Sequence, residues 1–452
     1  MGQPVEAQVN PSSLPGTTPA LSAAAVRLEA HAGRDPLQNP VFYQQLSQRY
    51  LLFDAFVAGQ RRVELHPLVL SQAAHRAART AAEATVRLVG RVTARAHRDP
   101  TEAARYGFHP EVLALARASH AASDTASLAR VDLLLGEDGI WRACEINADC
   151  PGGYNEALAL PRLAQDAGYW QGVDPTTVVA ALCERLAALA RGGTVALLYA
   201  TAYAEDLQVC ALVRRGLAER GVRAVLAPPT APRLAGGRLC ISGEPVTALY
   251  RFFPTEYMEG QANLGDLVAA VRSGAVRTLC SFTQIFPQSK LAFARAFSLR
   301  DSLPPDEQQA LDRHLPRTLD LAELPLSELV ADRAGWVVKR ALGRVGDEVF
   351  VGALVSEEAW PKLLAELYER RASGEVWIAQ RFVRQRKVPT PQGPRLLTLG
   401  AYVLDGAFVG YFARLSVESH VGHDALCVPV FVGPDAAPDS APLWARSSAE
   451  GL

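Results

Sequence analysis

The sequence predicts an α/β fold, and three segments carry this prediction. Residues 194–229 alternate an apolar strand, a helical stretch and a second strand, which is the order of a Rossmann-like unit. Residues 128–147 form two extended runs around the turn signal Asp138-Gly139, so we expect a β-hairpin there. A second region of mixed strands and helices covers residues 276–433. Its strand candidates are residues 336–338, 376–380 and 399–404.

The composition is that of a globular protein with more than one core. The chain has 452 residues, 49% of them apolar and 21% charged, and this length predicts two or three packed modules. The formal net charge of −1 supplies no general attraction for nucleic acid or anionic lipid, so neither is an expected partner. The Rossmann-like segment has no GxGxxG turn, which argues against a dinucleotide-dependent oxidoreductase.

The sequence carries no signal for membrane insertion or secretion. The charge-free stretch 192–204 is well short of the roughly 20 residues that cross a bilayer. The N-terminus lacks the basic start and continuous apolar run of a signal peptide. Seven cysteines are scattered without a CxxC pair, as is typical of reduced thiols. We therefore expect a cytoplasmic protein.

The two ends of the chain differ from its middle. Residues 1–38 and 434–452 are rich in proline, serine and alanine without sustained periodicity, so we expect mobile tails. Residues 39–110 have apolar side chains at helical spacing, most clearly in 70–96, and we expect a helical N-terminal scaffold.

Lysine is rare in this chain, although basic residues are not. Of the 46 lysines and arginines, only four are lysines. They are Lys290, Lys339, Lys362 and Lys387. A compositional bias of the genome explains the rarity itself. On that background the position of each lysine is informative, because arginine is the default.

The expected hairpin gathers polar side chains on one face. If its loop has two or four residues, even positions of the first strand share a face with odd positions of the second. Arg130, Asp132, Glu145 and Asn147 then lie together, whereas a three-residue loop would break this alignment. Carboxylate and amide oxygens are ligands that Mg²⁺ prefers, with phosphates and waters completing the shell. The alternative is a solvated hairpin with an Arg130–Glu145 ion pair across the strands.

A second candidate segment follows at residues 335–352. Lys339 ends an apolar strand on the same face as a valine, where a buried ammonium needs an anion to keep its charge. Gly343, Arg344 and Gly346 follow, and glycines let the backbone approach phosphates closely. A nucleotide phosphate is the natural partner. The alternative is an ordinary strand-end lysine beside a glycine turn.

These segments together resemble a known family. The motifs are the Arg-x-Asp and Glu-x-Asn hairpin, EINADCPGGYNEA, CSFTQIFPQSK, VVKRALGRVG, WIAQRFV and LGAYVLDGAFVGYFARLS. They resemble the circularly permuted ATP-grasp ligases, and within them the synthetase domain of glutathionylspermidine synthase and its relatives. The Glu and Asn positions precede the lysines here, whereas ordinary ATP-grasp chains have the reverse order. The likeness covers residues 110–430.

The resemblance assigns roles to individual residues. The implied Mg²⁺ ligands are Asp132, Glu145 and Asn147. The implied ATP-binding residues are Lys290, Lys339, Gly343, Arg344, Gly346, Gln380 and Phe382. The implied acyl-phosphate ligands are Arg130 and Arg414, whose planar guanidinium groups suit phosphoryl charge.

The resemblance also implies a domain plan and an activity. Residues 111–193 would be the metal-ligand part of the ATP-grasp core, 194–275 a Rossmann-like substrate-side unit and 276–433 the nucleotide-binding part. The expected activity is Mg²⁺- and ATP-dependent amide formation through an acyl phosphate, with release of ADP and phosphate. A small-molecule or peptide carboxylate and an amine would be the substrates. The alternative is a non-catalytic relative that binds a nucleotide or peptide as a scaffold.

Overall fold

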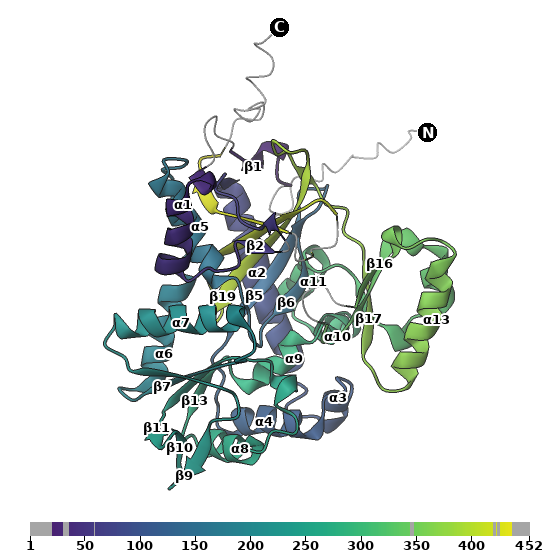
Figure 1. Cartoon of the computed structure of the whole chain (residues 1–452). Coiled ribbons are helices and arrows are strands. Elements are labelled where there is room, and N and C mark those ends of the chain that lie inside the picture. Colours follow the sequence, from purple (N-terminus) through teal and green to yellow (C-terminus); the bar gives the residue numbers. More distant parts are fainter. Residues whose placement is uncertain are drawn as a thin grey trace, which may run out of the picture.

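The computed structural model describes residues 20–29, 36–57, 59–343, 348–418, 422 and 425–435. Helices and strands alternate through most of this range, which confirms the predicted α/β class (Figure 1). Within the described part of the chain, no helix combines the length and apolar character needed to cross a bilayer.

The largest sheet carries the hairpin predicted from the sequence. Its strand order is β21-β20-β19-β5-β6, with β18 also paired to β19, and the pairings are antiparallel. The strands are β5 (Leu128–Leu135), β6 (Trp141–Asn147), β18 (Lys387–Val388), β19 (Arg395–Leu404), β20 (Ala407–Ser416) and β21 (Leu426–Val428). The early hairpin and the late strands thus form one continuous surface.

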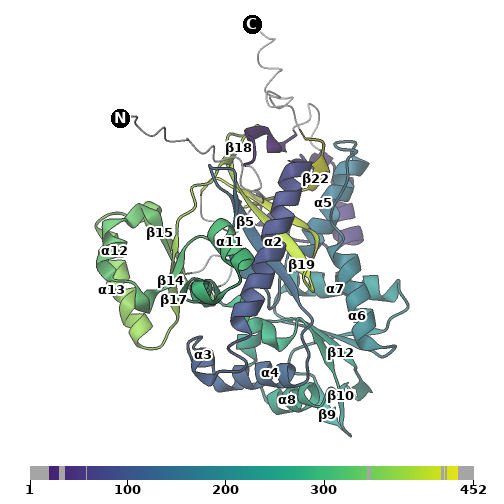
Figure 2. The same ribbon diagram turned by 180° about the vertical axis from the view of Figure 1, so that it is seen from behind.

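Helices cover both faces of this sheet. The long helix α2 (Gln72–Thr93) lies across β5, β6 and β19 (Figure 2). It starts at Ser71, whose hydroxyl accepts a hydrogen bond from the Ala74 amide, and its buried face is rich in alanine, which lets the helix approach closely. Two further helices pack on the sheet: α5 (Tyr154–Asp166) contacts β20, and α6 (Val178–Ala190) contacts both β19 and β20.

The predicted Rossmann-like unit is present as a four-stranded sheet. Its order is β13-β12-β7-β8, and every pairing is parallel. The elements are β7 (Val195–Tyr199), α7 (Ala204–Ala218), β8 (Ala224–Ala227), β12 (Ala248–Phe252), α8 (Leu264–Arg272) and β13 (Arg277–Leu279), with α4 (Pro110–Ala121) against α8. A small antiparallel sheet joins β8 to β12 and contains β9 (Arg233–Ala235), β10 (Arg238–Ile241) and β11 (Glu244–Pro245).

A smaller lobe projects from the rest of the molecule, on the right in Figure 1. Its sheet has the order β14-β17-β15-β16. The elements are β14 (Thr318–Asp320), α12 (Leu326–Ala331), β15 (Trp336–Arg340), β16 (Val349–Val351), α13 (Ala359–Ala372) and β17 (Trp377–Arg381). Trp336, Trp360 and Trp377 are fully buried and fill its core. Three short helices connect the lobe to the large sheet: α9 (Ile285–Gln288), α10 (Leu291–Ser298) and α11 (Pro305–His314).

The N-terminal region differs from the expectation in two ways. Strand β1 (Val26–Leu28) pairs with β4 (Leu68–Ser71), so part of the expected tail 1–38 belongs to the packed fold. Strand β22 (Val430–Gly433) pairs with β4 from the other side. The expected helical scaffold 39–110 contains α1 (Pro40–Gln44), α2 and α3 (Pro100–Ala104), but also β2 (Phe56–Val57), β3 (Gln60–Arg61) and β4. A strand of only three residues carries too little alternation to be seen in sequence.

Candidate active site

The β5–β6 hairpin brings the four predicted polar residues onto one face, by a route that the sequence did not predict. The connection is residues 136–140, an odd number, and near the turn Leu133 pairs with Ala143. One extra residue, Cys144, then forms a bulge, and beyond it Asp132 pairs with Glu145 and Arg130 with Asn147. The bulge therefore restores the register that the odd loop would have destroyed.

Asp132 is the centre of the polar face and is fully buried. Arg130 binds it with both arms, Nε to Oδ1 at 2.7 Å and Nη2 to Oδ2 at 3.0 Å. Arg414, on β20, donates from Nη2 to Oδ2 at 2.8 Å. The Arg130–Glu145 pair considered as an alternative is thus replaced by an Arg130–Asp132 pair along the same strand. Burial alone would lower the pKa of Arg130, but the charge and hydrogen bonds of Asp132, with smaller contributions from Tyr402 and Glu145, together raise it.

The sheet leaves room for these two arginines. Gly400, on β19, lies opposite Asp132 on one side and Phe412 on the other, and a side chain there would meet the Arg130 stem, whose Cδ lies 2.7 Å from the ideal Cβ position. The Phe412 ring lies 5.5 Å from the Arg130 guanidinium and 5.3 Å from that of Arg414. A glycine and an aromatic ring therefore shape the space that both guanidinium groups occupy.

Lys290 reaches the same face from the turn between α9 and α10, where it is the N-cap residue of α10. Its Nζ lies 3.4 Å from Glu145 Oε2 and donates to the Gly343 carbonyl at 2.8 Å. Asn147 Nδ2 lies 3.4 Å from the other oxygen, Glu145 Oε1. Lys290 therefore links the hairpin to the start of the glycine-containing loop of the smaller lobe. Arg344 and Gly346, the other two predicted residues of that loop, lie outside the described residues.

Lys339 enters the site from the smaller lobe. Its Nζ donates to Gln380 Oε1 at 2.8 Å and to the Cys144 carbonyl at 3.2 Å, which is the bulge of the hairpin. Gln380 in turn donates to Thr318 Oγ1 at 3.1 Å. Phe382 follows β17, half-buried, with its amide bonded to the Gly335 carbonyl at 2.9 Å. Two predicted residues, Lys339 and Gln380, thus lie in direct contact.

The site holds more positive than negative charge. Four cationic side chains surround two carboxylates: Arg130, Lys290, Lys339 and Arg414 around Asp132 and Glu145. Burial alone would raise the pKa of Glu145, but the surrounding lysines and arginines outweigh it and hold the pKa well below its usual range. Burial lowers the pKa of Lys339, and Cys144 and Glu145 offset this only in part. The buried surplus of positive charge favours a polyanion such as a polyphosphate.

The predicted Mg²⁺ ligands are unequally placed for that role. The Glu145 side chain is 30% exposed, and Asn147 is half-buried beside it. Both oxygens of Asp132 already accept hydrogen bonds from guanidinium groups. No cluster of three or more His, Cys, Asp or Glu side chains suited to a metal occurs among the described residues. Glu145 and Asn147 fit a Mg²⁺ ion that takes its remaining ligands from phosphates and water.

Several residues of this site were missed from the sequence. Tyr402 and Phe412 lie on the same face, and the Tyr402 hydroxyl donates to the Gly152 carbonyl at 2.6 Å. The same carbonyl accepts a hydrogen bond of 3.0 Å from Arg130 Nη1. The signal was available, because Tyr402, Gly400, Phe412 and Arg414 occupy alternate positions of the β19–β20 hairpin.

The seven cysteines lie in the described part of the chain, and all are free thiols, as predicted. Cys144 is the one at the site. Burial raises the pKa of its thiol to about 12, which disfavours the thiolate that a cysteine nucleophile requires.

The chain was compared with curated proteins and with solved structures. No curated protein matches the chain. Among solved structures, a glutathione synthetase-like effector (GSS30) from Globodera pallida, in its apo form, has a TM-score of 0.57 at 10% identity, covering 89% of this chain and 98% of that one. A structure described as a candidate gamma-glutamylcysteine synthetase from Methylobacillus flagellatus has a TM-score of 0.42 at 14% identity, covering 78% and 92%.

The first of these likenesses shows a shared fold across nearly the whole of both chains. The sequence itself shows the family. The profile of the glutathionylspermidine synthase preATP-grasp family matches residues 63–432, which include the hairpin, both buried lysines and Arg414, and the chain belongs to this family.

Proposed function

We propose that the protein is an ATP-dependent ligase that joins a carboxylate to an amine through an acyl phosphate. The observation that carries this proposal is the convergence of Lys290 and Lys339 on Glu145, beside an Asp132 held by two arginines. Family membership and the glutathione synthetase-like fold support the ligase class.

The lysines would bind the nucleotide. Lys290 and Lys339 reach the site where the smaller lobe faces the hairpin, and Gly343, which accepts from Lys290, begins the loop after β15. Their charge would hold the β- and γ-phosphates, with Gln380 fixing the Lys339 ammonium. Glu145 and Asn147 would hold Mg²⁺, with Asp132 as the third predicted ligand. When bound, the ion supplies further neutralisation of phosphate charge.

The arginines would act on the phosphoryl group that is transferred. The substrate carboxylate attacks the γ-phosphorus, the bond to ADP breaks, and Arg130 and Arg414 hold the charge that develops on the transferred group. The amine then attacks the acyl carbon, phosphate leaves and the amine loses its proton. The chain supplies position and charge in both steps, and needs no nucleophile of its own.

The products of nucleotide consumption test this proposal. Purified protein is incubated with Mg²⁺-ATP, hydroxylamine and a panel of amino acids, small peptides and glutathione. We expect at least one acid to give a hydroxamate together with ADP and phosphate. Lys339→Met should abolish the reaction. Lys362→Met is the matched control, because Lys362 is exposed on α13 and pairs only weakly with Glu358.

Two outcomes would overturn the proposal in different ways. AMP as the main product would exclude an acyl phosphate even if an amide formed. Nucleotide binding without acid-dependent consumption across the panel would favour the alternative, a non-catalytic nucleotide-binding scaffold.

A further inference from the structure

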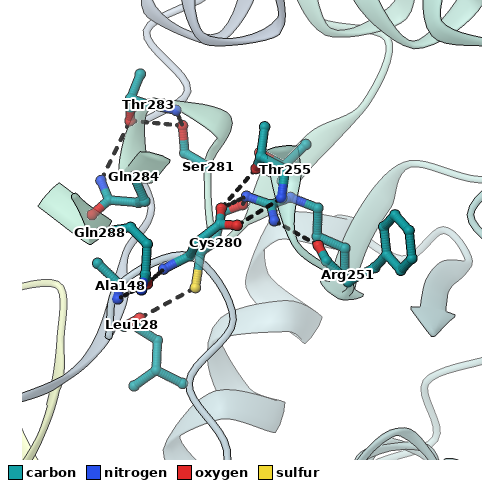
Figure 3. Close-up of polar contacts among 12 residues, drawn as sticks. Leu128, Ala148, Arg251, Thr255, Cys280, Ser281, Thr283, Gln284 and Gln288 are labelled. Atoms are coloured by element: carbon teal, nitrogen blue, oxygen red, sulfur yellow. Dashed lines mark hydrogen bonds and ion pairs between the residues drawn. The ribbon is translucent and has the colours of Figure 1, made fainter. Parts of the chain in front are cut away.

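The loop that follows β6 is held by a fully buried ion pair outside the site described above. Asp149 and Arg251 are both 0% exposed, and Arg251 Nη2 donates to Asp149 Oδ1. Asp149 also accepts hydrogen bonds of 2.7 Å from the Thr255 amide and from the Thr255 hydroxyl. Figure 3 shows Arg251 and Thr255 converging on this point from the Rossmann-like unit.

The same loop is held from its other side. Gln288 Oε1, at the end of α9, accepts from the Ala148 amide at 2.9 Å and from the Asp149 amide at 3.0 Å (Figure 3). Arg251 is itself fixed, because its Nη1 donates to the Phe253 carbonyl at 2.9 Å and its guanidinium lies 4.7 Å from the Phe282 ring. The loop is thus clamped between the Rossmann-like unit and α9.

The clamped loop contributes directly to the arginine side of the site. Three residues after Asp149, the Gly152 carbonyl accepts hydrogen bonds from Arg130 Nη1 and from the Tyr402 hydroxyl. Gly153 then adopts a left-handed conformation with φ of 90° and begins α5. The position of the Gly152 carbonyl is therefore set on one side by Asp149 and on the other by the helix start.

A buried ion pair is a poor way to gain stability. The desolvation of two charges cancels most of their attraction, and an apolar pair of similar volume is often as stable. What the pair gives is a single geometry for the atoms around it. Here those atoms lead, through Gly152, to the guanidinium that would hold the transferred phosphoryl group.

We propose that Asp149 and Arg251 are positioning residues that fix the Arg130 guanidinium through the Gly152 carbonyl. This inference rests on the proposed function for its kinetic consequence and on the contacts above for its structural one. The nucleotide lysines reach the site from the start of α10 and from the smaller lobe, where Lys290 contacts Glu145 and Gly343, and Lys339 contacts Gln380 and the Cys144 carbonyl. Loss of the pair should therefore slow the chemical step and leave nucleotide affinity unchanged.

The test compares Asp149→Asn with a variant in a second buried ion pair. Glu102 and Arg295 form a bidentate pair at 2.7 and 2.9 Å between α3 and α10, with both residues buried. Glu102→Gln therefore removes one charge of a buried pair without touching the loop. We expect Asp149→Asn to lower kcat for acid-dependent ADP formation at least tenfold, with the Kd for ATP within twofold of wild type. We expect Glu102→Gln to lose as much thermal stability as Asp149→Asn and to keep kcat within threefold of wild type.

A second readout does not need turnover. Butanedione modifies accessible arginines, and mass spectrometry assigns the rate at each position. Arg130 is 9% exposed, and we expect its modification to accelerate at least fivefold in Asp149→Asn but not in Glu102→Gln. If wild type consumes no ATP with any acid, the proposed function fails while this measurement still decides the positioning role.

Either of two results would overturn the inference: a folded Asp149→Asn with wild-type kcat and Arg130 reactivity, or equal effects in Glu102→Gln. Should Asp149→Asn fail to fold, Thr255→Val removes only the hydroxyl that donates to Asp149, and Thr255→Ser retains it. We expect Thr255→Val to show the same changes at smaller size and Thr255→Ser to behave as wild type. If Thr255→Val and Thr255→Ser had the same kcat and the same Arg130 reactivity, that result would also contradict the inference.

Discussion

Lys339 on β15 donates a hydrogen bond of 2.8 Å to the Gln380 side chain on the neighbouring strand β17. The acceptor is a neutral amide oxygen, so it orients the buried ammonium without balancing its charge. The cost of burying that charge appears in the lowered pKa of Lys339. We therefore expect Lys339 to contribute more to the affinity for a bound anion than to the stability of the fold.

Lys339→Met should therefore separate binding from stability. We expect ATP affinity, measured by calorimetric titration, to fall about 10- to 100-fold, since a buried charge–phosphate contact is worth a few kcal/mol. The free energy of unfolding without nucleotide should stay within about 1 kcal/mol of wild type or rise, because an uncompensated buried ammonium is removed. Lys362→Met should change neither quantity, and unchanged ATP affinity in Lys339→Met would reduce Lys339 to a strand-end residue.

Glu145→Gln tests the proposed metal ligand. The amide retains the shape of the side chain but offers a neutral oxygen where Mg²⁺ prefers a charged one. We expect ATP turnover to fall at least 100-fold at any Mg²⁺ concentration, with an unchanged circular dichroism spectrum. Turnover that returns to the wild-type rate at saturating Mg²⁺ would show that the ion is held elsewhere.

Gly153→Ala tests how tightly the loop fits the sheet. Its φ of +90° is unfavourable for alanine, and an added Cβ would lie 2.8 Å from Phe412 Cδ1 and 2.9 Å from the Tyr402 hydroxyl. We expect urea denaturation to show a loss of about 1–3 kcal/mol from backbone strain and overpacking together. Gly168→Ala is the control, because Gly168 has φ of +75° and open space around it. A Gly153→Ala loss no greater than the control would mean that Phe412 moves aside freely.

Glu156 predicts a pH dependence of stability. Burial, together with Asp54 and Glu205, raises its pKa to about 7, against the opposing charge of Arg62. The folded state then binds a proton that the unfolded chain releases near pH 4.5, so this residue's contribution weakens stability as pH rises from 4.5 to 7.

Glu156→Gln should remove that component. We expect the variant to gain on the order of 1–3 kcal/mol relative to wild type at pH 8, since one pKa unit corresponds to about 1.4 kcal/mol. At pH 4 the two proteins should unfold at similar urea concentrations. An equal stability difference at both pH values would show that the carboxyl does not titrate between them.

The hairpin shows which part of the site local sequence could predict. The alternating side-chain pattern and the Asp138-Gly139 turn were sufficient to predict that the hairpin exists and that it has a polar face. The register depended on loop parity and on the bulge at Cys144, which no local pattern marks. The correct face was predicted from a loop length that the structure does not have.

The Asp149–Arg251 pair shows what sequence could not supply. Its partners lie 102 residues apart, Asp149 in the loop after β6 and Arg251 on β12 of the Rossmann-like unit, so only the folded chain brings them together. The rarity of lysine was the opposite case, because it drew attention to only four positions, and the family resemblance selected Lys290 and Lys339 among them. The short strand β1 was missed because three residues beside an alanine-rich stretch carry no detectable period.

The place of β5, between the edge strand β6 and β19, has a consequence for how the protein is made. Its neighbour β6 follows it at once, but β19, its other neighbour, leaves the ribosome only after the Rossmann-like unit and the smaller lobe have been synthesised. Until then one edge of β5 has no partner, and its apolar residues Val131 and Leu133 have incomplete cover. An unpaired apolar edge is an aggregation hazard. Nascent chains and truncations that end before residue 395 should therefore be far more dependent on chaperones than the finished protein.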